Sequence, residues 1–277
     1  MLCRELHLEI AGERLLEVYK AKCSLGAVNI SYRETLALDN PFQLESKFEK
    51  DIFGKVLKCD ITLLVSRIQE DKNVIDVSLS PFQIYQGSDK SVEQELGQTS
   101  GFGTTEQVQD AIEQGIQSAL YRGPKLGFPI SQLSIKCLFL GLYTPLLSSP
   151  AAIRAAAHAC MREILDSQQG EILEPIMSIH VNTPSQYVGA ISRDLSSHRR
   201  GIITSIDSDT QNMDDSSVTQ VSRTVLDAKV PLSNLVGYAS TLRGLSQGNG
   251  EWKMQIEGYS SVPRDQEEKL IKTIRGY

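Results

Sequence analysis

The stretch LEPIMSIHVN, residues 173–182, decides how the C-terminal part of this chain folds. Its apolar residues Met177, Ile179 and Val181 alternate with polar neighbours, which is typical of a strand that buries one face and exposes the other. The stretch therefore predicts a half-buried β-strand, and the segments on either side of it can be placed outward from this strand.

The residues after this strand alternate between helical and extended patterns. Thr183-Pro184 is expected to open a helix that ends at Gly201. Proline is favoured in the first turn of a helix, and glycine is favoured just after the last helical residue. Strands are expected over residues 202–207, 222–230 and 252–257, and a second helix is expected over residues 235–242. This order predicts a ferredoxin-like β-α-β-β-α-β unit.

The middle of the chain follows a different plan of strands and helices. Residues 55–65 alternate as a strand, and residues 75–79 are expected to return as its hairpin partner after a turn at residues 70–73. A helix capped by Thr105 is expected over residues 105–121. The other expectations are a polar loop over residues 87–103, a strand over 133–139 and a helix over 150–165 that starts at Ser149-Pro150.

At 277 residues the chain is long enough for about two compact domains. Residues 6–19 have the pattern of an amphipathic helix that cannot bury its apolar stripe alone, so we interpret them as the remnant of a preceding domain. Further sequence is therefore expected upstream of Met1, and no transit peptide is expected within the chain. The expected divisions are residues 1–27, 28–167 and 168–277.

Composition and charge argue against several classes of protein. The net charge of −6 at pH 7 argues against a protein that coats nucleic acid, so any RNA contact must use small basic patches. No apolar run reaches the ~18 residues that a membrane span needs. The five cysteines are isolated and odd in number, which indicates reduced thiols, with Cys59 and Cys137 as small apolar strand residues.

Residue patterns that carry catalysis or cofactor binding are absent from the sequence. It contains no G-x-x-x-x-G-K-[ST] loop to cradle nucleotide phosphates and no H-E-x-x-H pair to bind zinc. Ser148 and Ser149 are interpreted as a helix cap before Pro150, because no G-x-S-x-G turn surrounds them. The acidic loop at residues 207–215 lacks the spacing of a calcium site. No catalytic, cofactor-binding or metal-binding residue is therefore expected.

Several motifs, in order along the chain, resemble the final domain of elongation factor G. They lie at residues 173–177, 199–201, 230–232, 237–243 and 247–248. Residues 5–10 resemble the end of the third domain of that family, and residues 31–35 resemble the start of its fourth. Within the family, the chain is most similar to the mitochondrial ribosome-releasing branch, on residues 123–127, 140–150 and 263–266.

The resemblance implies a fold and a function. The fold class is α+β, with a ribosomal-protein-S5-domain-2-like domain containing a left-handed crossover, followed by a ferredoxin-like domain. The implied function is that of a ribosome-binding C-terminal arm, in a parent that splits post-termination ribosomes together with the ribosome recycling factor. The parent would be a monomeric GTPase of the mitochondrial matrix, with GTP and Mg²⁺ held in its N-terminal domain and no membrane partner.

The segment at residues 141–149 departs from the family pattern. Elongation factor G has Gly-x-Tyr-His-Asp-x-Asp-Ser-Ser at the tip of its fourth domain, where this chain has Thr144 for the histidine and apolar residues or proline for both acids. The loss of polar contacts suits a recycling factor better than a translocase. A translocating elongation factor G stays open as the alternative, and an autonomous α+β enzyme or ligand-binding protein is the third.

The candidate ribosome- or RNA-contact residues are mostly cations. They are Lys47, Lys50, Lys55, Tyr143, Thr144, Arg193, His198, Arg199, Arg200 and Arg243. The densest local patch contains Arg199 and Arg200 beside the end of a helix, where cations also complement the helix dipole. A solvated helix terminus is the alternative interpretation of this patch.

Overall fold

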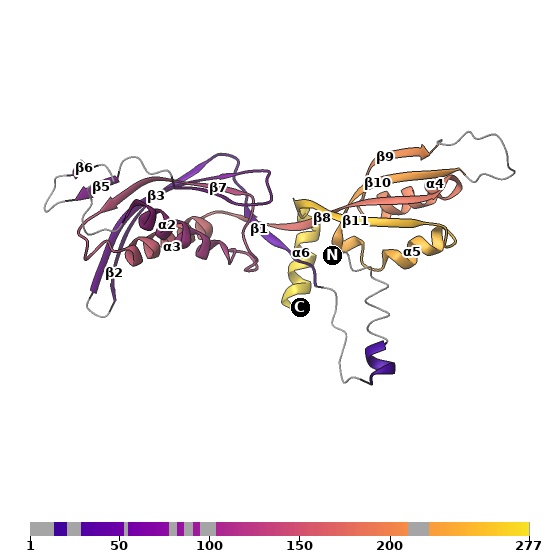
Figure 1. Ribbon diagram of the computed structural model, residues 1–277, viewed down its shortest axis with the longest axis horizontal. Coiled ribbons are helices and arrows are strands. Elements are labelled where there is room, and N and C mark those ends of the chain that lie inside the picture. The colour runs from indigo at the N-terminus through magenta and orange to yellow at the C-terminus, as the bar shows by residue number, and fades with distance from the viewer. Residues whose placement is uncertain are drawn as a thin grey trace. The chain divides into compact units, whose positions relative to one another are not determined.

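A computed structural model describes residues 14–20, 29–52, 55–77, 82–85, 91–94, 104–209 and 222–276. The chain divides into two compact units (Figure 1). The first, which we call the ferredoxin-like unit, comprises Met1–Ser31 and Glu174–Ser260; the second, the mixed-sheet unit, comprises Tyr32–Leu173 and Ser261–Tyr277. The predicted division at 167/168 placed residues 261–277 with the C-terminal domain, whereas the contacts group them with the mixed-sheet unit.

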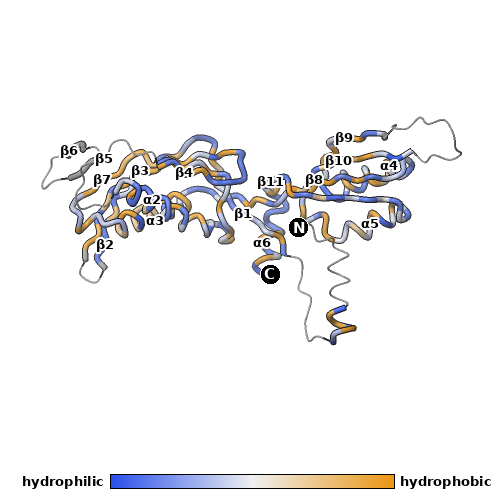
Figure 2. Tube along the Cα trace, in the orientation of Figure 1, coloured by the Kyte–Doolittle hydropathy of each residue, from blue (hydrophilic) through white to orange (hydrophobic). Residues whose placement is uncertain are grey.

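The mixed-sheet unit is built on strands in the order β2-β3-β7-β5-β6. These strands are β2 (Phe42–Ile52), β3 (Lys55–Arg67), β5 (Phe82–Tyr85), β6 (Ser91–Gln94) and β7 (Leu133–Leu142). Helices α2 (Thr105–Leu120) and α3 (Pro150–Ser167) pack on this sheet and on each other (Figure 1). Figure 2 shows hydrophobic and hydrophilic positions interspersed along β2, as a strand with one buried face requires.

The predicted hairpin of β3 with the strand after it is wrong. The antiparallel partner of β3 is β2, and β4 (Val74–Asp76) instead pairs in parallel with β7. Strand β7 lies between them because it bonds to β3 along one edge and to β4 and β5 along the other. Strand β6, inside the predicted loop 87–103, pairs with β5.

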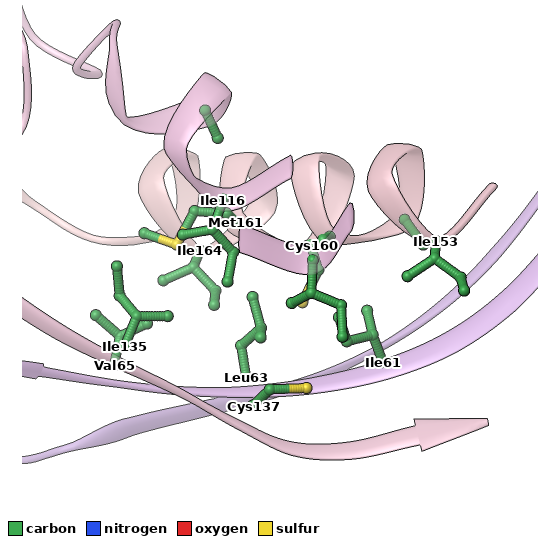
Figure 3. Close-up of a cluster of buried hydrophobic side chains, with 14 of the residues drawn as sticks. Ile61, Leu63, Val65, Ile116, Ile135, Cys137, Ile153, Cys160, Met161 and Ile164 are labelled. Atoms are coloured by element: carbon green, nitrogen blue, oxygen red, sulfur yellow. The ribbon is translucent and has the colours of Figure 1, made fainter. Parts of the chain in front are cut away.

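The core of the mixed-sheet unit confirms the strand alternation that the sequence predicted. Ile61, Leu63 and Val65 are fully buried on one face of β3 and face the helices (Figure 3). Cys59 and Cys137 lie in this core as predicted. Cys3 and Cys23 lie outside the described residues.

The starts of both helices follow from their capping residues. The Thr104 hydroxyl accepts a hydrogen bond from Gln107 N–H, and the Gln107 side chain accepts from Thr104 N–H, so α2 begins with a capping box. The predicted cap was Thr105, one residue too late. Ser149 caps α3 with Pro150 in the first turn, as predicted.

The C-terminal residues have the predicted ferredoxin-like order. The elements are β8 (Gly170–Pro184), α4 (Ser185–Arg193) continued by a π-helical turn (Asp194–His198), β9 (Ile202–Asp209), β10 (Arg223–Pro231), a 3-10 turn (Leu232–Asn234), α5 (Tyr238–Leu245) and β11 (Glu251–Ser261). β8 lies between β11 and β10, and β9 lies outside β10. The first residues of β8 also pair with β1 (Arg33–Leu36).

One core lies between this sheet and its two helices. Ile179 and Val181 of β8 and Leu226 of β10 are fully buried against Ile191 and Leu195. The helical stripe and the strand alternation expected from the sequence are confirmed here.

Two terminal segments differ from expectation. Helix α6 (Arg264–Arg275) was not predicted, although Pro263 before it and Gly276 after it, at φ 79°, are helix start and stop signals. Of the predicted helix 6–19, the described part is a π-helical turn, Arg14–Val18, and residues 6–13 lie outside the described residues. No helix in the described ranges is long and apolar enough to cross a membrane.

Candidate functional site

Tyr143, at the end of β7, is fixed by contacts to β3. Its hydroxyl donates to Asp60 Oδ2 at 2.9 Å, and the Lys58 ammonium lies 4.7 Å from its ring centroid. Lys58 also forms an ion pair with Glu49 of β2 at 3.1 Å. Asp60 and Lys58 were not predicted as site residues. The signal that could have found Asp60 is that it is the one carboxylate in the sequence of β3.

The loop after Tyr143 is a hydrogen-bonded turn with an apolar tip. The Ser148 hydroxyl donates to the Lys58 carbonyl at 2.6 Å and accepts from Tyr143 N–H at 2.9 Å. The Thr144 carbonyl accepts from Leu147 N–H and Ser148 N–H. Thr144 is exposed, and the Leu146 side chain is 85% exposed. The loop thus presents a leucine, a residue that the sequence analysis did not single out.

The three predicted lysines lie on the β2–β3 hairpin. Lys47 and Lys50 are exposed on β2, paired across the strands with Asp60 and Leu57. Lys55 opens β3, and its side chain lies outside the described residues. The hairpin therefore presents two described cations close in sequence, in the same unit as the Thr144 loop.

Arg199 is not an available cation. Its guanidinium donates to Asp194 Oδ2 at 2.8 Å, to the Asn234 carbonyl at 2.6 Å and to Thr241 Oγ1 at 2.9 Å. It also lies 4.7 Å from the ring centroid of Tyr238, and its side chain is only 15% exposed. Arg199 therefore joins the end of α4 to α5 within its own domain, and we assign it a structural role.

Arg200 is also engaged inside the domain. Its guanidinium forms a two-pronged ion pair with Glu174 of β8, at 2.7 and 3.3 Å. Glu174 is 3% exposed and accepts a further hydrogen bond from Ser233. Since a buried carboxylate requires a partner, Arg200 neutralises Glu174. The left-handed backbone of Arg200, φ 56°, turns the chain just before Gly201.

Arg193, His198 and Arg243 differ from this pair because they project to solvent. Arg193 is the last residue of α4, Arg243 lies on α5, and both are exposed. Neither side chain has an ion pair within the described part of the chain. His198 is 72% exposed and lies 3.4 Å from Asp194. Because α4 and α5 both cover the same face of the sheet, these cations lie on one helical layer.

The described residues hold neither a metal-ligand cluster nor an activated thiol. Within them, no group of three or more His, Cys, Asp or Glu is arranged to hold a metal ion. Burial raises the pKa of the Cys137 and Cys160 thiols to about 12 and raises that of Cys59 further, so these thiols are not activated nucleophiles. The exposed cations and the apolar tip of the Thr144 loop are suited to binding a partner.

Comparison with known proteins matches both units. The family model "Elongation factor G, domain IV" matches residues 82–169, and "Elongation factor G C-terminus" matches residues 171–270. Elongation factor G of Thermotoga petrophila is 31% identical over 98% of this chain and 34% of its own length. Ribosome-releasing factor 2, mitochondrial, of Danio rerio is 28% identical over 98% of this chain and 32% of its own length.

A solved structure agrees with these matches. A crystal structure of a Thermus thermophilus protein superposes on 99% of this chain and 36% of that chain, with a TM-score of 0.74 at 24% identity. The chain spans about a third of the length of the curated relatives it matches. Both units, in this order, define the C-terminal part of a translation factor.

This chain belongs to the elongation factor G family, and it contains domain IV and the C-terminal domain of such a protein. The predicted fold class, α+β, is thereby confirmed.

Proposed function

We propose that this chain is the ribosome-binding C-terminal arm of a mitochondrial factor that, with the ribosome recycling factor, splits post-termination ribosomes. The observation that carries the proposal is the loop at residues 141–149. Thr144 stands where the family pattern has a histidine, Pro145 and Leu147 stand where it has two carboxylates, and the exposed Leu146 lies between them. An arm without those polar groups is suited to an apolar contact rather than to the decoding site. The Danio rerio relative, named as a ribosome-releasing factor, supports this assignment.

Binding to the ribosome would use the cations that the fold leaves exposed. Arg193 and Arg243 project from the helical layer of the ferredoxin-like unit, and Lys47 and Lys50 from the β2–β3 hairpin. Phosphate contacts of this kind are electrostatic and weaken as salt rises. In cosedimentation with ribosomes, Arg193→Gln with Arg243→Gln should therefore weaken binding at low salt and flatten its salt dependence. Unchanged binding at every salt concentration would contradict this assignment.

The alternative is the arm of a translocating elongation factor G. It is favoured by the bacterial relative from Thermotoga petrophila, which at 31% identity is as similar as the mitochondrial one at 28%. A full-length parent tested with the recycling factor should split ribosomes and should not support translocation. Translocation at the rate of a bacterial factor, without splitting, would establish the alternative.

We place the nucleotide of the parent outside this chain. Hydrolysis of GTP in this family's manner requires a phosphate-cradling loop with a lysine and a hydroxyl that holds Mg²⁺. The sequence contains no such loop, so its residues do not fit that group. Calorimetric titration of the chain with GTP and Mg²⁺ should give no saturable heat. Micromolar binding would mean that the chain is an autonomous nucleotide-binding protein.

A further inference from the structure

A cation-lined cleft lies in the mixed-sheet unit, away from the residues singled out above. It has a volume of about 750 Å³ and is bounded by the end of α2, the loop at residues 122–127, α3 and the last turn of α6. This volume falls within the ~300–1,000 Å³ of ligand sites. None of the ribosome-contact residues proposed above lines this cleft.

The loop that forms one wall of the cleft is held rigidly from behind. The fully buried Glu34 carboxylate accepts hydrogen bonds from Lys125 N–H and Leu126 N–H, both at 2.8 Å, and from Phe128 N–H at 2.9 Å. A Cβ on Gly123 would lie 2.3 Å from Glu34 Oε2, so only glycine fits there. The wall therefore does not need to be ordered when a ligand arrives, which lowers the entropic cost of binding.

The lining of the cleft is cationic. It includes Arg122, Lys125, Arg162 and Arg275, together with His158, and no acidic residue. Two of these cations are paired with carboxylates outside the lining, because Lys125 binds Glu267 at 2.6 Å and Arg162 binds Asp166 at 2.9 Å.

Arg122 and Arg275 have no carboxylate partner in the described part of the chain. The Arg275 guanidinium donates to the Lys125 carbonyl at 3.3 Å. Arg275 is the last residue of α6, where a cation complements the helix dipole by about 0.3–1 kcal/mol. Arg122 follows the C-cap of α2, and the dipole of α2 does not account for its place in the cleft.

The chemistry of the lining favours phosphate over a nucleobase. Guanidinium groups bind phosphate through paired N–H donors. No Phe, Tyr or Trp lines the cleft, so a base would have no aromatic face to stack on.

We propose that this cleft binds phosphate groups of an RNA backbone. This inference rests on the proposed function and deepens it, by giving the arm a built RNA contact in the mixed-sheet unit that is separate from both the Thr144 loop and the helical layer. It uses charge and shape and reads no sequence.

The test measures binding of a fluorescent RNA hairpin to the full chain by anisotropy, across a range of salt concentrations. Arg122→Gln with Arg275→Gln should weaken binding about tenfold at low salt and lower the salt slope by about one for each charge removed. Lys269→Gln with Lys272→Gln is the matched control, because both lysines are exposed on α6 and neither lines the cleft. The control should retain the affinity and most of the slope. Equal effects in both pairs, or none in the first, would overturn the proposal.

A second measurement locates the phosphate directly. Titration with inorganic pyrophosphate should shift the NMR amide signals of Gly123, Leu126 and Gly127 saturably, and it should displace the RNA. Pyrophosphate binding at these amides without RNA binding would overturn the assignment to RNA and point to a small phosphorylated ligand. Intact ribosome binding by the cleft variant would refute the cleft and leave the proposed function standing, whereas no ribosome binding by the unaltered chain would refute the proposed function itself.

Discussion

At the scale of single residues, Arg199 and Arg200 show that an arginine after a helix can stabilise its own domain through hydrogen bonds and ion pairs. Arg199 donates to three acceptors and covers the Tyr238 ring, and Arg200 neutralises the buried Glu174. These contacts hold the end of α4 to α5 and to β8. Substitution of either arginine should therefore lower the free energy of unfolding of the ferredoxin-like unit, and any loss of partner binding would be secondary to that.

We predict that Arg199→Ala destabilises the ferredoxin-like unit by about 2 kcal/mol, because it leaves Asp194 and two other acceptors without their donor. Trp252 is the single tryptophan and packs edge-on against Tyr238, with ring centroids 5.1 Å apart, so its fluorescence reports unfolding of this unit. Denaturant unfolding followed by Trp252 fluorescence measures the change. Arg193→Ala is the control and should stay within about 0.5 kcal/mol of the parent. Equal losses in both variants would show that Arg199 is only a surface cation.

The buried thiols of the mixed-sheet unit should be inert in the native state. Burial raises the pKa of Cys137 and Cys160 from 9.0 to about 12, so at pH 9 each carries far less thiolate than a free cysteine. Alkylation at pH 9, located by peptide mass spectrometry, should therefore modify them only after unfolding. Rapid modification of either thiol in the folded chain would contradict this burial.

The same pKa shifts set the sign of a pH effect on stability. The folded state keeps its thiol protons at pH values where the unfolded chain loses them. The free energy of unfolding should therefore carry this contribution in full below pH 9 and lose it as the pH rises from about 9 to 12.

At the scale of elements, helices α2 and α3 approach closely at Gly115. A Cβ at this position would lie 2.4 Å from the Arg154 carbonyl oxygen and 2.8 Å from Ala157 Cβ. Both of these atoms belong to the facing helix and neither is the end of a flexible side chain. The glycine is therefore required by packing and not by backbone conformation.

We predict that Gly115→Ala destabilises the mixed-sheet unit by about 1–2 kcal/mol. Overpacking costs about 1–3 kcal/mol, against a gain of about 1 kcal/mol in helix propensity. Denaturant-dependent exposure of the buried thiols reports this unit, because Cys59, Cys137 and Cys160 all lie in it.

Gly189→Ala is the matched control for this substitution. Gly189 is exposed on α4 with no atom within 4 Å of an added Cβ, so alanine should stabilise the ferredoxin-like unit by about 0.5–1 kcal/mol. Stabilisation by both substitutions would show that α2 and α3 are not in close contact at Gly115.

At the scale of the whole molecule, the last residues of the chain belong to the mixed-sheet unit. Val262 N–H donates to the Ile172 carbonyl at 2.9 Å, and Glu267 binds Lys125 at 2.6 Å. Glu267 also accepts from Ile172 N–H at 3.3 Å. The chain thus returns to a unit that it left at residue 173.

We predict that ending the chain at Ser260 lowers the stability of the mixed-sheet unit and leaves the ferredoxin-like unit nearly unchanged. The truncation removes the hydrogen bonds of Val262 and Glu267, whereas the core around Trp252 loses no residue. Thiol exposure should shift to lower denaturant while the Trp252 transition keeps its midpoint. A fall in the Trp252 midpoint alone would place α6 with the ferredoxin-like unit.

The sequence determined the elements whose apolar residues recur at a fixed period. The alternation at residues 173–182 and the stripe Val188, Ile191 and Leu195 placed the ferredoxin-like unit correctly, because each element must bury one face. Local chemistry also marked the start of α3 at Ser149-Pro150. It did not separate Thr104 from Thr105 as the cap of α2, since both have the required hydroxyl.

Only the tertiary structure decided which strands pair and which cations are available. Strand β3 is hydrogen-bonded to β2 on one side and to β7 on the other. No local sequence pattern encodes that β7 lies between β3 and β4. Arg193 and Arg199 have the same charge and the same helical neighbourhood in sequence. They differ because Asp194, Asn234 and Thr241 bind the Arg199 guanidinium, whereas Arg193 is exposed. Asn234 and Thr241 lie 35 and 42 residues from Arg199 in sequence, so these two contacts exist only once the chain has folded.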